Sequence, residues 1–194
     1  MASTISYLLR KFRRFLAREL SEVAFARRYP DATIAEGVLL YGAGRITAGK
    51  KLFLDRRAYL NTGTLNGGRG YITMGDNVEI GPYCVFWGAG GIEIGNNVHI
   101  GAHVSITAHE ALQVPAARGE GPLDFEYAPV IIEDCTLVCS GTTIVPGVRI
   151  GHHSMIGAGA VVVSDIPPYS LAVGCPARVI KTQVPFEEIA IPTA

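Results

Sequence analysis

Bulky aliphatic side chains recur at every sixth position over a long C-terminal stretch of the chain. Between Ala128 and Lys181 they fall at Ile132, Val138, Ile144, Ile150, Ile156 and Val162. An α-helix would repeat its apolar positions about every 3.6 residues and an ordinary strand every second residue, so this step fits neither. A period of six is typical of a solenoid whose flat sides are short strands and whose corners are tight turns.

Small or modest side chains precede these aliphatic residues by two positions. They are Val130, Thr136, Thr142, Val148, Ser154 and Ala160. In a triangular coil the aliphatic residue points inwards, the residue two before it fills the corner, and three six-residue units close one coil. The coils then stack at about the 4.8 Å spacing of paired strands. Because one coil cannot bury its inner face alone, we expect stability only from the stack.

The six-residue step also organises the earlier part of the chain, less regularly. It begins at Ile34, is broken by the glycine-rich stretch 66–70, and resumes until Ile106. Asn77 and Asn97 fall at predicted corners. Asparagine tolerates the left-handed backbone conformation that tight turns need, so we expect both residues in such turns.

The period stops at His109. Residues 109–127 contain two prolines, two glycines and several charges, which predicts a loop that leaves the solenoid at one corner. Long loops in compact domains are usually functional or disordered. The regular repeat then resumes directly after this loop.

The N-terminal segment predicts an amphipathic helix from Ser3 to Arg28, ending before Pro30. The apolar face of this helix could pack on the solenoid or on a neighbouring subunit. Alternatively, because its polar face is basic, residues 3–28 could make peripheral contact with an anionic membrane. The chain thus divides into a helix within 1–30, a solenoid over 31–181 and a tail over 182–194.

Composition narrows the class of protein. The 17 Lys and Arg residues balance the 17 Asp and Glu residues, which argues against a general nucleic-acid binder. The four cysteines, which form no C-x-x-C pair, are interpreted as small hydrophobic residues in a reducing compartment. No apolar run approaches the roughly 20 residues of a membrane span, and charges interrupt the segment where a secretory signal would lie. We therefore predict a cytoplasmic protein.

The stretch 165–181 reads Asp-Ile-Pro-Pro-Tyr-Ser-Leu-Ala-Val-Gly-Cys-Pro-Ala-Arg-Val-Ile-Lys. It resembles the terminal motif of galactoside, maltose and colanic-acid acetyltransferases, and with the repeats it makes residues 34–181 similar to the hexapeptide-repeat acyltransferases. The resemblance implies an all-β solenoid, a left-handed parallel β-helix, although crossover connections are usually right-handed. It also implies a homotrimer with each active site between neighbouring prisms, and acyl transfer from acetyl-CoA to a carbohydrate hydroxyl, as in polysaccharide biosynthesis.

His109 matches the catalytic histidine of that family. A sugar hydroxyl attacks a thioester poorly unless a base removes its proton, and histidine side chains ordinarily titrate in a suitable range. Such a base contributes on the order of 10²–10⁴ in rate, so we predict His109 as the general base. The adjacent Glu110 is predicted to orient the imidazole, with Asp124 and Glu126 as alternatives.

The resemblance also implies a donor site. Ser140 and Ala158 match positions beside the pantetheine arm, where small side chains let the arm approach the backbone. Arg178 and Lys181 match cationic positions that meet the nucleotide phosphates, where charge-assisted contacts are strong. Galactoside-type enzymes carry Thr-Lys where this chain has Val163-Ser164, so one nucleotide contact is expected to be missing or replaced.

The acceptor side departs further, because the acidic and asparagine residues of the galactoside enzymes are not found. Counting coils places Trp87 one coil from His109 near the same corner and facing outwards. An exposed indole there suits stacking on a sugar ring, with Tyr83 as a companion; the alternative for Trp87 is a contact in the trimer interface.

Three other functions remain as alternatives. N-acylation of an amino sugar or nucleotide sugar would use the same base. A zinc hydratase of the γ-carbonic-anhydrase type needs three converging histidines, and the histidine spacing here does not match, so no metal is expected. A non-catalytic scaffold would need neither the loop after His109 nor the cationic tail at Arg178 and Lys181.

Overall fold

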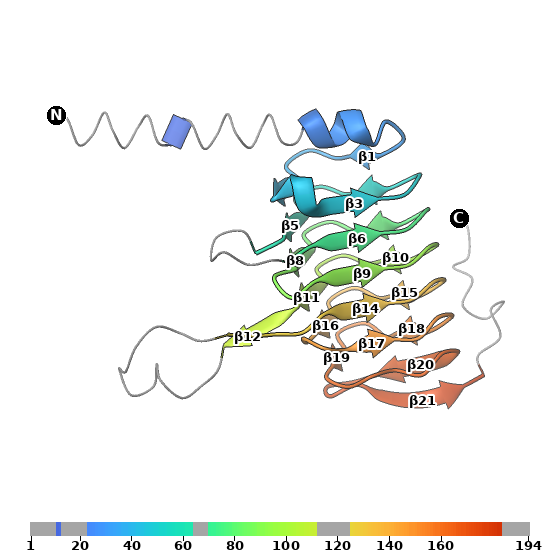
Figure 1. Ribbon diagram of the computed structural model, residues 1–194. Helices are drawn as coiled ribbons and strands as arrows, with labels where there is room; N and C mark the ends of the chain where they lie inside the picture. Colours follow the sequence, from blue (N-terminus) through green and yellow to red (C-terminus); the bar gives the residue numbers. More distant parts are fainter. Residues whose placement is uncertain (1–10, 13–22, 64–69, 112–124, 184–194) are drawn as a thin grey trace, which may run out of the picture.

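The chain winds through three parallel sheets in turn and so forms a triangular solenoid (Figure 1). The structure, a computed structural model, describes residues 11–12, 23–63, 70–111 and 125–183. We name the sheets A, B and C in the order in which the chain visits them. The corners are then AB, BC and CA, each named for the sheet the chain leaves and the sheet it enters.

Sheet A is parallel except for its last pair, β20 and β21, which is antiparallel. Its order is β1 (Thr33–Ile34), β4 (Phe53–Leu54), β7 (Glu79–Ile80), β10 (His99–Ile100), β15 (Leu137–Val138), β18 (Met155–Ile156), β20 (Ser170–Val173) and β21 (Arg178–Thr182).

Sheets B and C are parallel throughout. Sheet B contains β2 (Leu39–Tyr41), β5 (Tyr59–Asn61), β8 (Val85–Trp87), β11 (Ser105–Thr107), β16 (Thr143–Ile144) and β19 (Val161–Val162). Sheet C contains β3 (Ile46–Ala48), β6 (Ile72–Met74), β9 (Ile92–Ile94), β14 (Val130–Ile132) and β17 (Arg149–Ile150), and a 3₁₀ turn, η1 (Ala43–Arg45), precedes β3. The predicted six-residue sides are therefore confirmed.

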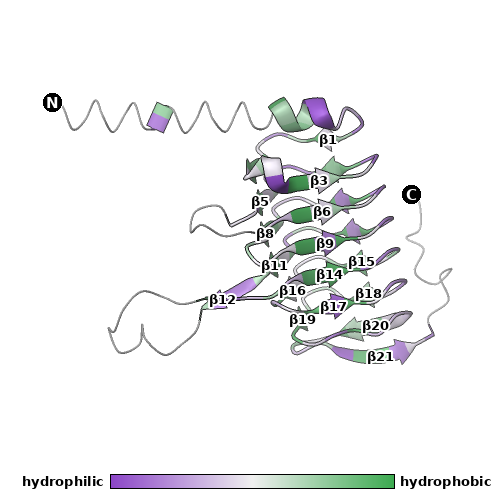
Figure 2. Cartoon of the chain, viewed as in Figure 1, coloured by the Kyte–Doolittle hydropathy of each residue, from purple (hydrophilic) through white to green (hydrophobic). Residues whose placement is uncertain are grey.

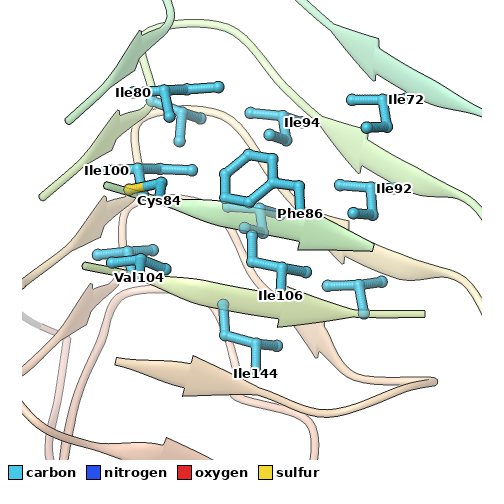
Figure 3. Packing of buried hydrophobic residues seen from close by; sticks show 14 of the residues in the cluster. Ile72, Ile80, Cys84, Phe86, Ile92, Ile94, Ile100, Val104, Ile106 and Ile144 are labelled. Atoms are coloured by element: carbon cyan, nitrogen blue, oxygen red, sulfur yellow. The ribbon is translucent and has the colours of Figure 1, made fainter. Parts of the chain in front are cut away.

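The inward residues stack into columns along the solenoid axis (Figure 3). In sheet B the column includes Leu60, Phe86, Ile106, Ile144 and Val162, all fully buried. Figure 2 shows the hydrophobic residues on the stacked strands, whereas β12 and β21 carry hydrophilic ones. Each inward side chain packs on its equivalents in the coils above and below, which is why the sequence needs an aliphatic residue at every sixth position.

The corners are filled as the sequence predicts. The residues two before the aliphatic positions are all buried, and the polar ones among them are satisfied by the backbone: Thr136 donates to Glu133 O at 2.8 Å, and Thr142 donates to Cys139 O at 2.7 Å. Asn77 and Asn97 have φ values of 55° and 54°. The left-handed turns predicted for these two residues are therefore confirmed.

The described part of the N-terminal helix ends against the top of the solenoid. Residues 23–28 are helical, Phe25 is buried, and its ring lies 4.7 Å from that of Tyr29. The predicted packing on the solenoid is therefore seen for this part, while residues 1–10 and 13–22 of the predicted helix lie outside the described residues. None of the helices described is long and apolar enough to cross a bilayer.

Candidate active site

The segment predicted as a loop begins and ends as a two-stranded ribbon. β12 (His109–Ala111) pairs antiparallel with β13 (Phe125–Tyr127), and Figure 1 shows β12 extending away from the stacked coils. His109 lies directly opposite Tyr127, and its ring centroid is 6.1 Å from that of Tyr127 and 5.6 Å from that of Phe125. The ribbon therefore holds His109 by cross-strand contacts rather than leaving it on a free loop.

His109 lines a cavity of about 290 Å³ at the BC corner. The other residues of the lining are Asn61, Gly63, Trp87, Ala89, Phe125 and Tyr127. The ring centroids of Trp87 and His109 are 6.1 Å apart. The predicted proximity of these two residues is therefore seen. Most of the described lining residues carry an aromatic ring, and none of them is Asp, Glu, Lys or Arg.

Asn61 is a polar residue of this cavity that the sequence did not reveal. It is fully buried; its Nδ2 donates to Tyr59 Oη at 2.8 Å, and its Oδ1 accepts from Gly63 N at 2.8 Å. Asn61 lies in register with Trp87 on the neighbouring strand. Counting six-residue units could have placed Asn61 two coils from His109, but the break in the repeat at 66–70 made that count uncertain.

Glycine is required where the ribbon leaves the coil. A Cβ atom on Gly90 would lie 2.1 Å from Ala108 O and 2.8 Å from Ala128 N. The backbone on each side of the ribbon thus passes too close for any side chain. Gly88–Gly91, which appears in the sequence as an insertion, is therefore what allows β12 and β13 to leave the solenoid at this point.

The structure does not bring Glu110 to the imidazole. Within the described residues, Nδ1 of His109 is buried and has no hydrogen-bond partner. Glu110 is exposed and lies opposite Glu126 in the ribbon. Because neighbouring side chains of a strand point to opposite faces, both carboxylates face away from the side that carries His109. Asp124, the other candidate, lies outside the described residues.

The predicted donor residues line the AB corner in order along the solenoid. Ser140 Oγ accepts a hydrogen bond from Ala102 N at 3.1 Å, and Ser140 O accepts one from Gly159 N, next to Ala158, at 3.0 Å. Arg178 pairs with Val173, whose side chain lies against Gly157. Ser140, Ala158 and Arg178 are all exposed.

Lys181 is on the same strand as Arg178 but nearer the other edge of sheet A. It is exposed and pairs with Leu171, whereas Arg178 pairs with Val173 at the AB end of β20. The two cations therefore lie along β21, with Arg178 below the small residues of the AB corner and Lys181 farther towards the CA end of the strand. This arrangement can meet several phosphates at once.

His109 and the predicted donor residues lie at opposite ends of sheet B in one chain. Ser140 precedes β16 at the AB corner, whereas His109 follows β11 at the BC corner, and these two strands are neighbours in register. The six residue-to-residue steps from Ala102 to Ala108 span roughly 20 Å of extended chain at about 3.3 Å per step. One chain alone therefore does not place His109 beside a thioester bound at Ser140.

Tyr83 does not join Trp87 at the BC corner. It lies at the AB corner with φ 59°, and its ring stacks on that of His103 with centroids 5.1 Å apart and an angle of 4° between the planes. Tyr83 follows an inward position of sheet A, not of sheet B, so it turns outwards at the other corner. The cavity that holds His109 is thus built without it.

A second and larger hollow of about 530 Å³ lies on sheet C and the CA corner. Glu133 lines it, accepts a hydrogen bond from His152 N at 2.8 Å and forms an ion pair with Arg149. Partial burial acts to raise the pKa of Glu133, but the His152 N–H and the Arg149 guanidinium outweigh it and lower the pKa. The carboxylate thus ties neighbouring coils together.

All four cysteines are free. Burial raises the pKa of the Cys139 thiol, which is next to Ser140, and raises that of the Cys84 thiol to about 11. Within the described ranges, no group of three or more His, Cys, Asp and Glu side chains could hold a metal ion.

Comparison with known proteins agrees with this architecture. The model of the hexapeptide repeat of succinyl-transferase matches residues 71–108 and 129–164. Galactoside O-acetyltransferase of Escherichia coli is 31% identical over 150 residues, which cover 77% of this chain and 63% of that protein. The chain matches less than two thirds of the length of the curated relatives most similar to it.

Two solved structures show the same fold. A maltose O-acetyltransferase from Clostridium difficile has a TM-score of 0.57 and 28% identity, over 78% of this chain and 66% of that one. A variant of AntD, an N-acyltransferase from Bacillus cereus, has a TM-score of 0.68 and 23% identity, over 78% and 80%; it is bound to dTDP-4-amino-4,6-dideoxyglucose and coenzyme A. The left-handed parallel β-helix and the resemblance to the hexapeptide-repeat acyltransferases are therefore confirmed.

Proposed function

We propose that this protein transfers an acyl group, most simply acetyl, from coenzyme A to a hydroxyl of a carbohydrate. The observation that carries the proposal is the order of residues along the AB corner. Arg178 lies below Ala158, and Ala158 lies below Ser140, in the sequence in which an extended thioester with phosphates at one end would meet them. Small side chains at the two upper positions leave the backbone accessible to the arm.

His109 acts as the general base in this proposal. The imidazole takes the proton of the acceptor hydroxyl while the oxygen forms a bond to the acyl carbon and the carbon–sulfur bond breaks. The imidazolium then returns the proton to the departing thiolate, which gives the ester and free coenzyme A. A base in this position contributes on the order of 10²–10⁴ in rate.

The complete site is shared between two copies of the chain, in a homotrimer. His109 and Ser140 lie at opposite ends of sheet B, so the BC corner of one copy must face the AB corner of the next. A cyclic trimer repeats this contact three times and closes. The buried Nδ1 of His109 has no partner within the described residues of its own chain, which is consistent with an orienting group elsewhere in the assembly.

The lining of the His109 cavity favours an uncharged sugar ring as acceptor. Trp87 and Phe125 offer apolar faces, Asn61 supplies a fixed amide, and carboxylates and cations are absent from the described lining. A cavity of about 290 Å³ suits one ring. N-acylation of an amino sugar is the second candidate, because AntD shares the fold and is bound to an amino sugar nucleotide.

Calorimetric titration with acetyl-CoA tests the donor site. We expect the wild type to bind and the double variant Arg178→Ala/Lys181→Ala to bind at least about tenfold more weakly, since charge-assisted contacts to phosphate are lost. The double variant Lys50→Ala/Lys51→Ala removes the same charge from the exposed CA corner and should bind like the wild type. Absence of binding by the wild type at millimolar acetyl-CoA would overturn the proposal.

The two acceptor chemistries are separated by thiol release with matched sugars. A neutral glycoside and its 4-amino analogue are compared at equal concentration, and the product is treated with mild base, which cleaves an ester but not an amide. We expect turnover with the glycoside and a base-labile product. A product formed only from the amino analogue would replace O-transfer by N-transfer.

A further inference from the structure

The AB corner is a continuous ladder of residues in the left-handed conformation. From bottom to top these are Gly159, Gly141, His103, Tyr83, Arg57 and Gly37, with φ between 56° and 77°. Backbone hydrogen bonds connect successive levels: Gly159 N to Ser140 O, Gly141 N to Ala102 O, and His103 N to Pro82 O, at 2.8–3.0 Å. Residues of this ladder therefore lie directly above one another along the edge of the prism.

The ladder changes character between Gly141 and His103. A Cβ atom on Gly159 would meet nothing within 4 Å, and one on Gly141 would meet only the backbone of Gly159. The next levels carry rings: His103 lies flat on Tyr83, and the guanidinium carbon of Arg57 lies 6.0 Å from the centroid of the Tyr83 ring. A bare edge thus ends at a stack of bulky side chains.

We infer that the His103–Tyr83 stack closes the upper end of the donor groove and limits the acyl group to two carbons. The inference rests on the proposed function. With the phosphates of the donor at Arg178 and its arm along Ala158 and Ser140, the thioester end points up the ladder. Ala102 lies above Ser140, and His103 lies above Gly141. The imidazole of His103 is therefore the first ring above the bare edge, and a longer acyl chain meets its face.

The stack makes a firm stop because its members support one another. His103 and Tyr83 lie parallel at 5.1 Å, and Arg57 covers the far side of the phenol ring. Moving the imidazole would therefore break ring contacts as well as change its rotamer. A pocket that is filled in this way discriminates by about 10–200-fold for each extra methylene group.

Glycine at position 103 removes the stop without straining the backbone. His103 has φ 56°, a conformation that glycine adopts more easily than histidine. A matched control exists at the CA corner, where His153 has the same φ of 56° and stacks on Tyr169 with centroids 5.0 Å apart. His103→Gly and His153→Gly therefore each remove a histidine that stacks on a tyrosine, at two different corners, although His153 also contacts His152.

The test is calorimetric titration with coenzyme A, acetyl-CoA and butyryl-CoA, which needs no acceptor. For the wild type we expect acetyl-CoA to bind at least tenfold more tightly than butyryl-CoA. In His103→Gly this preference should fall at least tenfold through tighter binding of butyryl-CoA, with the affinity for coenzyme A itself unchanged. His153→Gly should behave like the wild type.

The titrations distinguish failure of the acyl stop at His103 from failure of the proposed function. If the wild type binds coenzyme A but His103→Gly keeps the wild-type preference, or if the wild type binds both acyl donors equally, the acyl stop is wrong and the donor site stands. If the wild type binds neither coenzyme A nor acetyl-CoA, the proposed function itself is overturned, and the acyl stop with it.

Discussion

The two ends of sheet B are built in different ways. At the AB corner the coils follow one another regularly, and the lower levels expose small residues such as Ser140, Ala158 and Gly159. At the BC corner the repeat is interrupted before β6, before β9 and after β11. The side chains around His109 are those of Trp87 and Phe125, which are half-buried, and of Tyr127, which is exposed.

This difference shows what each part of a solenoid can do. Regular coils repeat the same backbone geometry about every 4.8 Å. Such a surface suits an extended ligand, such as the pantetheine arm, that lies along the backbone of several coils. Interruptions bring side chains from several coils to one place, which suits a compact acceptor and a base. We therefore expect substitutions at the two corners to affect different kinetic quantities.

His109→Ala should give the largest effect. Loss of the base is expected to lower kcat by on the order of 10²–10⁴, with the Kd of acetyl-CoA unchanged because the donor residues lie at the other corner. Steady-state thiol release and calorimetry measure the two quantities. His99→Ala, an exposed histidine of sheet A, is the control. If kcat decreases by less than tenfold in His109→Ala, His109 is not the general base.

Ala158→Trp should have the next largest effect. An indole on the bare edge of the AB corner is expected to weaken acetyl-CoA binding at least about tenfold by overlap with the arm, without changing the KM of the acceptor. Lys50→Trp places the same side chain on the exposed CA corner and serves as the matched control. If the two variants bind the donor equally well, the arm does not follow the AB corner.

Trp87→Ala should act on the acceptor instead. We expect the acceptor KM to rise by up to about tenfold, which corresponds to the 0.5–1.5 kcal/mol of an aromatic contact, and the donor Kd to stay the same. Trp87 also packs on Tyr59 at 5.4 Å, so thermal unfolding must be compared, and Trp87→Phe should recover most of the loss. Normal acceptor KM and normal kcat in Trp87→Ala would place this residue outside the site.

Glu133→Gln should have the smallest effect, and only on stability. The pKa of Glu133 is lowered in the folded state, so its carboxylate stabilises the fold at neutral pH and this contribution is lost as the pH falls through the folded-state value. We expect the variant to be less stable by about 1 kcal/mol at pH 7, and the difference to shrink as the pH falls through the folded-state pKa. Chemical denaturation over a series of acidic pH values measures this, and a difference that stays constant on acidification would contradict the assignment.

The repeat made much of the architecture predictable. A single period placed the inward columns, the buried corner residues and the left-handed turns at Asn77 and Asn97, because each is a local property of one coil. Counting coils also placed Trp87 beside His109, since the insertion at 88–91 adds residues but not a coil. The family resemblance supplied the donor candidates, of which Ser140, Ala158 and Arg178 lie in order along the AB corner.

The cavity around His109 was less predictable, because it depends on the interruptions of the repeat. Phe125 and Tyr127 reach His109 only through the antiparallel register of β12 and β13, which the repeat cannot specify. The same register turns Glu110 away from its neighbour in sequence. Tyr83 lies at the AB corner and not beside Trp87. It follows a strand of sheet A, and the chain enters the AB corner after each strand of that sheet.

The central claim is that each active site combines the BC corner of one copy with the AB corner of another. Its most direct test is to refold His109→Ala and Ala158→Trp together and to assay the mixture at a low acetyl-CoA concentration, at which each variant alone has little activity. Because a mixed cyclic trimer contains one interface with an intact base facing an intact donor groove, an equal mixture should regain about a quarter of wild-type activity per chain. A mixture that stays as inactive as its components, although mixed trimers form, would contradict the account.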